Sequence, residues 1–305
     1  MSAISNAPLL AIVGTTASGK SSVAMELAKN VSGLEIISVD SMQIYRGMDI
    51  GTAKPTKEEL GLVPHHMIDL VDPDEDYTIS EYQKQAQEVL KDMEKRKSIP
   101  LLVGGTGLYL RTIIDDLTIP GQYPDVRKEI DTEPETAKLY EELTRLDSLA
   151  ASRIEENNRR RILRALEVTV GSGKKFSSYG PGLTQYPKSE FKIFGLKWER
   201  DLIDQRIITR YQWQLENGFL DEVKRLFNSP TEISRTAAQA LGYKQFLEHL
   251  RGELSFEEAF EKAIADTKKF ARKQERWFRR DPRTYWIEIK EDPLEAMPIL
   301  MKEYR

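Results

Sequence analysis

The sequence predicts an α/β protein: a parallel sheet flanked by helices, with a helical insertion. Three observations support this fold class. Apolar runs alternate with helical patterns, which is typical of βαβ units. The first apolar run leads into a complete phosphate-loop motif at residues 14–21, so the sheet is expected to be P-loop NTPase-like. Between residues 115 and 188 the strand signal disappears and charge-rich helical sequence replaces it.

Short apolar runs predict the strands, because a strand buried on both faces of a sheet carries few polar residues. They lie at residues 8–13, 34–39, 99–103, 191–198 and 285–289. The strand at 99–103 runs into a glycine-rich segment at 104–107. We therefore expect several loops to leave the sheet at the carboxyl ends of its strands.

Helical periodicity predicts six helices outside the insertion. They lie at residues 20–30, 78–96, about 200–228, 234–250, 255–281 and 293–304. Ser80 with Gln83, and Ser255 with Glu258, stand at capping-box spacing near the starts of two of them. Together these elements predict a core domain of residues 1–114 and 189–305 and an insertion domain of residues 115–188.

The composition excludes several classes of protein. The chain has 305 residues, 40% hydrophobic and 31% charged, which is typical of a globular protein. No run approaches the ~18 apolar residues of a membrane helix, and no signal-peptide pattern opens the sequence. We therefore expect a cytoplasmic protein with no membrane partner. Cysteine is absent, which excludes disulfides, thiolate nucleophiles and cysteine zinc sites.

The net charge of −4 argues at first against a nucleic-acid partner. The charge is, however, sorted along the chain. Residues 57–94 hold 11 acidic and 3 basic residues, whereas residues 266–285 hold 8 basic and 3 acidic ones. An acidic body with basic stripes would hold RNA in one orientation and repel it elsewhere.

The phosphate-loop motif G-x-x-x-x-G-K-[ST] is complete and lies between a predicted strand and a predicted helix. The backbone N–H groups of such a loop converge on an anion. The expected cradle consists of Gly14, Thr15, Thr16, Ala17, Ser18, Gly19, Lys20 and Ser21. Lys20 would reach the terminal phosphates and Ser21 would bind Mg²⁺. The alternative is a glycine-rich connection without a ligand, and the motif does not identify the polyphosphate.

Asp40 follows the second predicted strand, at the edge of the sheet where ligands collect. In an NTPase it would hold Mg²⁺, and in a transferase it could act as a base. An aspartate that only caps a turn is the alternative. Ser41, Met42, Gln43 and Tyr45 follow it with groups able to hydrogen-bond or stack a nucleobase.

Five sequence blocks, in order, make the chain similar to the bacterial tRNA dimethylallyltransferases, the tRNA isopentenyltransferases. They are GTTASGKS at 14–21, DSMQIY at 40–45, GTAKP at 51–55, GGTGLY at 104–109 and RALE at 164–167. The similarity continues through segments 206–219, 240–243 and 267–280, so it covers nearly the whole chain. This family transfers a dimethylallyl group from dimethylallyl diphosphate to the exocyclic N6 amine of the adenosine just 3′ of the tRNA anticodon.

The resemblance implies a role for each matching catalytic residue. Lys20, the loop amides and Mg²⁺ would stabilise the departing diphosphate. Asp40 would accept the amine proton, and Thr106 would help to orient the amine. Arg210 would reach the diphosphate. Arg206 shares its helix face at i, i+4 spacing, and a solvated face is the alternative for this pair.

The resemblance also gives the basic segments a partner, the tRNA anticodon stem-loop. One segment is the helix at 255–281, and a second basic cluster lies at 157–164 in the insertion, which we expect to bind tRNA. The expected tRNA contacts are Asp40, Ser41, Met42, Gln43, Thr106, Arg127, Arg160, Arg161, Arg164, Arg272, Arg276 and Arg279. A solvated helix surface is the alternative for the basic stripe of the helix at 255–281. We expect the enzyme to be a monomer.

Two further expectations concern histidine and tryptophan. His65 and His66 are expected in a loop without zinc, and the absence of cysteine removes the Cys/His zinc finger of eukaryotic family members. The four tryptophans are expected in the core. They are Trp198, Trp213, Trp277 and Trp286.

Two other functions remain open from the motifs alone. A small-molecule kinase would use the same loop for ATP and Asp40 for the metal. It would have no use for the Asp40–Tyr45 block or for the two arginine clusters. An RNA-binding protein with a vestigial phosphate loop is the second alternative, and the intact Lys20 and Ser21 argue against it.

Overall fold

The computed structural model describes residues 7–180, 182–183 and 185–305. The chain divides into two compact units. One holds the chain up to Asp115 together with Lys188–Arg305, and the other is Asp116–Pro187. No helix in the part of the chain that is described is long and apolar enough to cross a membrane.

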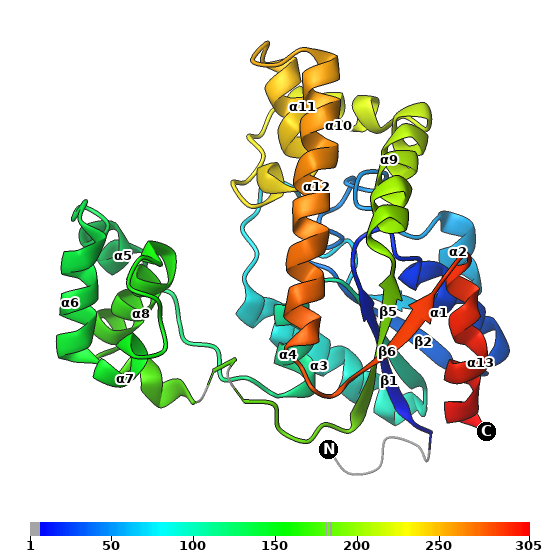
Figure 1. Cartoon of the computed structure of the whole chain (residues 1–305), viewed down its shortest axis with the longest axis horizontal. Helices are drawn as coiled ribbons and strands as arrows, with labels where there is room; N and C mark the ends of the chain where they lie inside the picture. The colour runs from blue at the N-terminus through cyan, green and yellow to red at the C-terminus, as the bar shows by residue number, and fades with distance from the viewer. Residues whose placement is uncertain (1–6, 181, 184) are drawn as a thin grey trace. The chain divides into compact units, whose positions relative to one another are not determined.

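The larger unit is built on a six-stranded sheet of order β3-β2-β4-β1-β5-β6, in which all neighbouring strands are parallel (Figure 1). The strands are β1 (Leu9–Gly14), β2 (Leu34–Val39), β3 (His65–His66), β4 (Ile99–Gly104), β5 (Phe191–Trp198) and β6 (Thr284–Ile289). Helices flank the sheet. The predicted α/β fold class is therefore confirmed.

The register aligns the carboxyl ends of the three central strands. Gly104 of β4 is paired with Val13 of β1 and with Val39 of β2. The phosphate loop, Asp40 and the segment after Gly104 therefore start at one edge of the sheet. This edge is where ligands bind in open α/β sheets.

The expectation that His65 and His66 lie in a loop is wrong. They form β3 and pair in parallel with Ile36 and Ile37 of β2. A strand of two residues is too short to show periodicity, so its pairing is decided by the neighbouring strand.

The helices of this unit cover both faces of the sheet (Figure 1). They are α1 (Lys20–Asn30), α2 (Lys57–Leu62), α3 (Ile79–Arg96), α4 (Gly107–Ile114), α9 (Arg200–Glu216), α10 (Phe219–Phe227), α11 (Tyr243–Leu250), α12 (Phe256–Arg279) and α13 (Met297–Leu300). Short 3₁₀ turns lie at η2 (Ala237–Gln239), η3 (Pro293–Ala296) and η4 (Met301–Tyr304). Helices α2 and α4 were not expected from the sequence.

Several predicted helix boundaries need correction. The segment at 200–228 forms two helices, because Gly218 adopts φ 94° between α9 and α10. This left-handed conformation suits glycine and ends the first helix. The segments at 234–250 and 293–304 are each broken by 3₁₀ turns.

The capping box predicted for α3 from Ser80 and Gln83 is wrong. Thr78 caps this helix and Glu81 completes the box. Both pairs have the required spacing, and the sequence alone does not choose between them. The box of Ser255 and Glu258 at α12 is confirmed.

Two apolar clusters lie on opposite faces of the sheet. Strand β1 contributes Leu9, Ala11 and Val13 to one cluster and Leu10 and Ile12 to the other. The first cluster is covered by α3, α4 and α9–α12, and the second by α1 and α13. Because β1 is buried on both faces, its sequence is a continuous apolar run.

Three of the four tryptophans pack against the core, and the fourth does not. Trp277 and Trp286 pack against the first cluster and Trp198 against the second. Trp213 is 55% exposed on α9, so the expectation of a core residue is wrong there. The polar residues around Trp213 do not by themselves reveal which face of α9 is covered.

The second unit is helical and has its own core. It contains α5 (Pro124–Ile130), α6 (Thr136–Leu146), α7 (Ser148–Ala151), α8 (Arg159–Ser172) and η1 (Phe176–Tyr179). Leu139 and Leu143 of α6 pack with Ile162 and Leu166 of α8. No buried residue of this cluster belongs to the clusters of the first unit in the described chain.

Candidate active site

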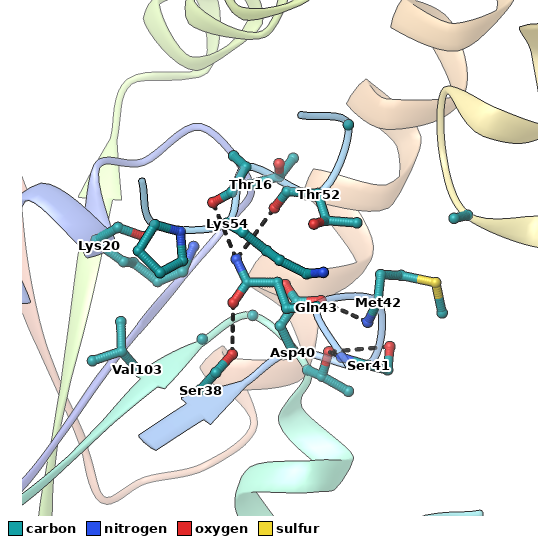
Figure 2. A pocket seen from close by; sticks show the side chains of 18 of the residues that line it. Thr16, Lys20, Ser38, Asp40, Ser41, Met42, Gln43, Thr52, Lys54 and Val103 are labelled. Carbon is teal, nitrogen blue, oxygen red and sulfur yellow. Dashed lines mark hydrogen bonds between the residues drawn. The ribbon is translucent and has the colours of Figure 1, made fainter. Parts of the chain in front are cut away.

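A cavity of about 480 Å³ lies at the carboxyl ends of β1, β2 and β4. Lys20, Asp40, Thr106 and Arg210 all line it, although they are distant in the sequence. Figure 2 shows Lys20 and Asp40 among the side chains that surround the hollow. The four residues expected to be catalytic are therefore brought together at one site.

The phosphate loop joins β1 directly to α1, as the motif predicts. Lys20 Nζ donates hydrogen bonds to Thr15 O at 2.6 Å and to Ser18 Oγ at 3.4 Å. Burial is the largest influence on Lys20 and lowers the pKa of its ammonium to about 8, while Asp40 opposes this and Arg210 adds to it. The loop thus holds a half-buried cation whose charge a bound anion would stabilise.

Arg210 extends from α9 to the same loop. Its Nη1 donates to Thr16 Oγ1 at 3.2 Å and its Nη2 donates to Gly51 O at 3.3 Å. Burial lowers the pKa of its guanidinium. Both acceptors are uncharged, so the positive charge of the guanidinium is not neutralised by these hydrogen bonds and can attract an anion.

Arg206 lies one turn earlier on α9 and has a different environment. Its Nε donates to Ala17 O at 2.8 Å, and its guanidinium lies 4.3 Å from the ring centre of Trp198. It lines a second cavity of about 730 Å³, on which the exposed Trp213 also borders. The i, i+4 arginine pair is therefore placed against the phosphate loop and is not a solvated face.

Gln274 of α12 was not predicted as a site residue. Its Oε1 accepts a hydrogen bond from Thr16 N at 2.8 Å, and its Nε2 donates to Gly105 O at 3.0 Å. It therefore joins the phosphate loop to the loop that carries Thr106. A glutamine among apolar and basic helix residues gives no sequence signal for such a bridge between distant loops.

Asp40 and Thr106 stand at the ends of adjacent strands. Asp40 Oδ1 accepts a hydrogen bond from Met42 N at 2.9 Å (Figure 2). Thr106 Oγ1 accepts one from Ser41 N at 3.2 Å, and Thr106 N donates to Val39 O at 3.1 Å. These bonds hold the Asp40 and Thr106 side chains against the turn that follows β2. A carboxylate and a hydroxyl at the cavity wall can receive and orient an amine.

Gln43 is engaged within the protein. Its Oε1 accepts from Ser38 Oγ at 2.7 Å, and its Nε2 donates to Thr52 O and Ala53 O at 3.2 and 3.1 Å (Figure 2). The amide thus holds the segment 51–55 over the end of β2. This gives Gln43 a structural role beside the tRNA contact expected from its position.

The basic residues of α12 are not all available as free charges. Arg272 pairs with Asp204 of α9. Arg279 pairs with Glu275 one turn away at 2.6 Å and remains exposed, as does Arg276. The surface of α12 therefore presents fewer unpaired charges than the sequence suggests.

The basic residues of the insertion unit also fall into two groups. Arg127 and Arg164 both approach Glu167, at 3.9 and 2.7 Å. Arg160 and Arg161 are exposed, and among the described residues their guanidinium groups have no hydrogen-bond or ion-pair partner. The first pair therefore stabilises α8, whereas the second pair is free to meet phosphates.

Comparison with known proteins identifies close relatives. The model of the IPP transferase family matches residues 43–281, and that of isopentenyl transferase matches residues 7–74. A tRNA dimethylallyltransferase of Carboxydothermus hydrogenoformans is 42% identical over 95% of this chain and 94% of its own length. One from Bifidobacterium longum is 41% identical over 96% and 90%.

Solved structures are similar over almost the whole chain. The tRNA isopentenylpyrophosphate transferase of Bacillus halodurans is 34% identical, with a TM-score of 0.70 over 97% of this chain and 96% of that one. A eukaryotic dimethylallyltransferase described as acting on tRNA is 26% identical, with a TM-score of 0.80 over 97% of this chain and 77% of that one.

Proposed function

The chain belongs to the IPP transferase family, and on that premise we propose how its cavity acts as a tRNA dimethylallyltransferase. It attaches a dimethylallyl group to adenosine 37 of tRNA, the adenosine just 3′ of the anticodon. The small-molecule kinase and the non-catalytic RNA-binding protein are therefore set aside. The observation that supports this mechanism is one cavity with two half-buried cations at the phosphate loop and an aspartate–threonine pair beside them.

The phosphate loop, Gly14–Ser21, binds the diphosphate of dimethylallyl diphosphate. As the bond between C1 and the diphosphate oxygen breaks, negative charge grows on the leaving group. Lys20 and Arg210 lie where this charge develops and stabilise it. Thr16 N is already bonded to Gln274, so the other loop amides and these two cations receive the diphosphate.

Magnesium fits this site as a partner of the diphosphate. Ser21 supplies a hydroxyl and Asp40 a carboxylate to the same cavity, and both are oxygen ligands of the kind that Mg²⁺ prefers. No group of three or more histidine and acidic residues suited to a metal occurs in the described chain. Ser21 would hold the ion with the diphosphate oxygens, where it supplies additional charge for the leaving group.

The acceptor amine is activated by Asp40 and Thr106, which line the same cavity. Asp40 accepts the proton that N6 of the adenine loses as its new bond to C1 forms. Oδ1 is bonded to Met42 N, which fixes the carboxylate and leaves Oδ2 to take the proton. Thr106 orients the amine, since its hydroxyl is held by Ser41 N at the same turn.

The prenyl tail occupies an apolar part of the cavity. Met25 and Ala24 of α1, Ile36 of β2 and Val103 of β4 line it together with Pro55. Met25, Ala24, Ile36 and Val103 are 7% exposed or less, whereas Phe270, which also lines the cavity, is 38% exposed. The small donor therefore suits the buried part, and the base of a large tRNA enters from the exposed part.

The anticodon stem-loop is bound by the basic residues of both units. Arg276 and Arg279 of α12 and Arg160 and Arg161 of α8 are exposed and supply phosphate contacts. Arg127, Arg164 and Arg272 contribute charge from within their ion pairs. We expect the enzyme to act as a monomer in the cytoplasm.

The test is mass spectrometry of tRNA nucleosides after incubation with dimethylallyl diphosphate, with and without Mg²⁺. We expect dimethylallyladenosine at position 37 only when donor and metal are both present. A parallel reaction with labelled ATP, candidate small acceptors and no prenyl donor serves as the control. Steady phosphoryl transfer in that control would contradict the proposed function.

A further inference from the structure

One wall of the cavity is a segment without helix or strand. Residues 51–55 line the cavity, and residues 49 and 50 come directly before them in the chain. The carbonyl groups of Ile50 and Gly51 accept hydrogen bonds from Gln214 Nε2 at 2.6 and 3.1 Å, and Gly51 O also accepts from Arg210. The conformation of this segment therefore affects where the Arg210 guanidinium lies.

A single buried carboxylate fixes that conformation. Glu222 of α10 is 1% exposed and accepts hydrogen bonds from the backbone N–H groups of Asp49, Ile50 and Gly51 at 2.9, 2.9 and 3.0 Å. Tyr243 Oη donates a fourth at 2.5 Å. Three consecutive N–H groups converging on one carboxylate form an anion cradle, which compensates the cost of burying the charge.

The segment is also packed tightly against the helix that carries Glu222. A Cβ atom added to Gly51 would lie 2.4 Å from Phe219 Cε2 and from Tyr243 Cε2. The carbonyl of Gly51 consequently has little freedom to move away from Arg210. The contacts run from Glu222 through Gly51 to Arg210 and then to Thr16 Oγ1 in the phosphate loop.

Arg210 depends on this support because no carboxylate holds it. Both of its hydrogen bonds in the described structure go to uncharged oxygens, and it forms no ion pair with a described acidic residue. A long side chain held only by neutral acceptors is placed by whatever fixes those acceptors.

We propose that Glu222 is a positioning residue for the diphosphate: through the backbone of residues 49–51 it sets Arg210 against the phosphate loop. This inference rests on the proposed function and concerns the same site. Glutamine cannot replace the carboxylate, because its NH₂ group would face a backbone N–H and two donors would meet.

A double-mutant cycle on the binding of inorganic diphosphate tests the proposal without any need for turnover. We expect Arg210→Gln to weaken binding about 10- to 100-fold, as for the loss of hydrogen bonds to a charged group. Glu222→Gln should weaken it about 5- to 10-fold. The double variant should bind within about twofold of Arg210→Gln alone, because Glu222 acts through that side chain.

Additive losses in the double variant would overturn the proposal, as would wild-type binding by Glu222→Gln. Glu35→Gln is the matched control, since Glu35 is another buried carboxylate of this unit and lies outside the cavity. It should lower thermal stability and leave diphosphate affinity unchanged. An equal loss of affinity in this control would mean that Glu222 is merely structural.

Tyr243→Phe provides a milder variant if Glu222→Gln fails to fold. It removes one of the four donors to Glu222 and should weaken diphosphate binding about two- to fivefold. Unchanged binding would overturn the proposal.

Prenylation of an anticodon stem-loop by the unmodified protein is measured separately. Failure of that reaction would overturn the proposed function and leave the result of the cycle intact.

Discussion

Asp40 and Lys20 line the same cavity but have different chemical roles, because their surroundings differ. Asp40 lies on a turn with one oxygen bonded to a backbone amide. Lys20 is half-buried at the start of α1 among backbone and hydroxyl oxygens. A carboxylate with a free oxygen suits proton acceptance, whereas an ammonium held in the phosphate loop suits a leaving group that becomes more negative.

Replacing Asp40 by asparagine should abolish the proton acceptor while keeping the oxygen that Met42 N requires. We expect turnover to fall about 10² to 10⁴-fold, the usual contribution of a general base. Affinity for tRNA should stay within a few fold. Single-turnover prenylation and tRNA binding are measured together, with the exposed Asp72→Asn as control. Near-normal turnover by Asp40→Asn would rule out the base.

Lys20 predicts a pH dependence for diphosphate binding. Its pKa of about 8 in the free protein means that the ammonium loses its proton as the pH rises through 8. A bound anion favours the protonated form, so affinity is highest below pH 8. It falls above that pH by up to about tenfold per unit.

Lys20→Arg isolates this effect, because a guanidinium stays charged over the whole range. Calorimetric titration of inorganic diphosphate between pH 7 and 10 should show a fall in affinity for the wild type that the variant lacks. The ionisation of the ligand is common to both proteins and cancels in the difference. Parallel profiles would contradict a role for the Lys20 charge.

Met25 offers a test of where the prenyl tail lies. Met25→Ala should enlarge the buried part of the cavity and allow a ten-carbon prenyl diphosphate to react. We expect the ratio of kcat/KM for the ten-carbon to the five-carbon donor to rise about tenfold, since each buried methylene contributes about 0.8 kcal/mol. Met93→Ala, a buried methionine of α3 outside the cavity, is the control. If both variants give the wild-type ratio, the tail lies elsewhere.

At the level of elements, α12 serves both the core and the surface. Its buried residues include Ala263, Ala271 and Phe278, and Gln274 reaches the phosphate loop from the same helix. Arg276 and Arg279 remain on its exposed side. The helix thus links a catalytic loop to a candidate RNA surface through one rigid backbone.

Reversing Arg276 and Arg279 to glutamate should weaken tRNA binding and flatten its salt dependence. Each lost phosphate contact reduces the slope of log K against log salt by about 0.7 to 0.9. Diphosphate affinity should not change, because neither residue lines the cavity. Lys91→Glu with Lys95→Glu on the exposed face of α3 is the matched control. A slope equal to that of wild type would identify the arginines as a solvated face.

At the level of the whole molecule, the two units have separate cores and separate proposed roles. The larger unit carries every residue assigned to donor binding and chemistry, and the smaller one carries Arg160 and Arg161. Because the cores share no buried residue in the described chain, a change on α8 should leave the cavity intact. Binding of donor and binding of tRNA can therefore be perturbed independently.

Arg160→Glu with Arg161→Glu tests this division. We expect tRNA affinity at low salt to fall about tenfold, with no change in diphosphate affinity. Combined with the two α12 reversals, the losses in binding free energy should add, since the residues share no partner. Arg159 of the same helix is already paired with Asp131. Arg159→Gln is therefore the control, because it can lower the stability of the helix but removes no unpaired charge. An unaltered tRNA affinity would exclude the insertion from the interface.

The sequence by itself determined the α/β fold, the phosphate loop, Asp40 and the strand limits at 34–39 and 191–198, because periodicity and short motifs are local. Helix limits failed at Gly218 and at Thr78, and the short strand β3 was missed, because these choices depended on packing. Composition also overstated the free charge on α12 and α8, because Arg272 pairs with Asp204 of another helix and Arg164 pairs with Glu167 of its own helix.

Only the tertiary structure decided which distant groups meet. It brought Arg210 from α9, Gln274 from α12 and Glu222 from α10 to loops that lie more than a hundred residues earlier in the chain. Such contacts carry no local signal, since a buried glutamine or glutamate looks like any surface residue in the sequence. Most of their partners are backbone groups, which every residue type possesses, so only the folded chain reveals the pairing.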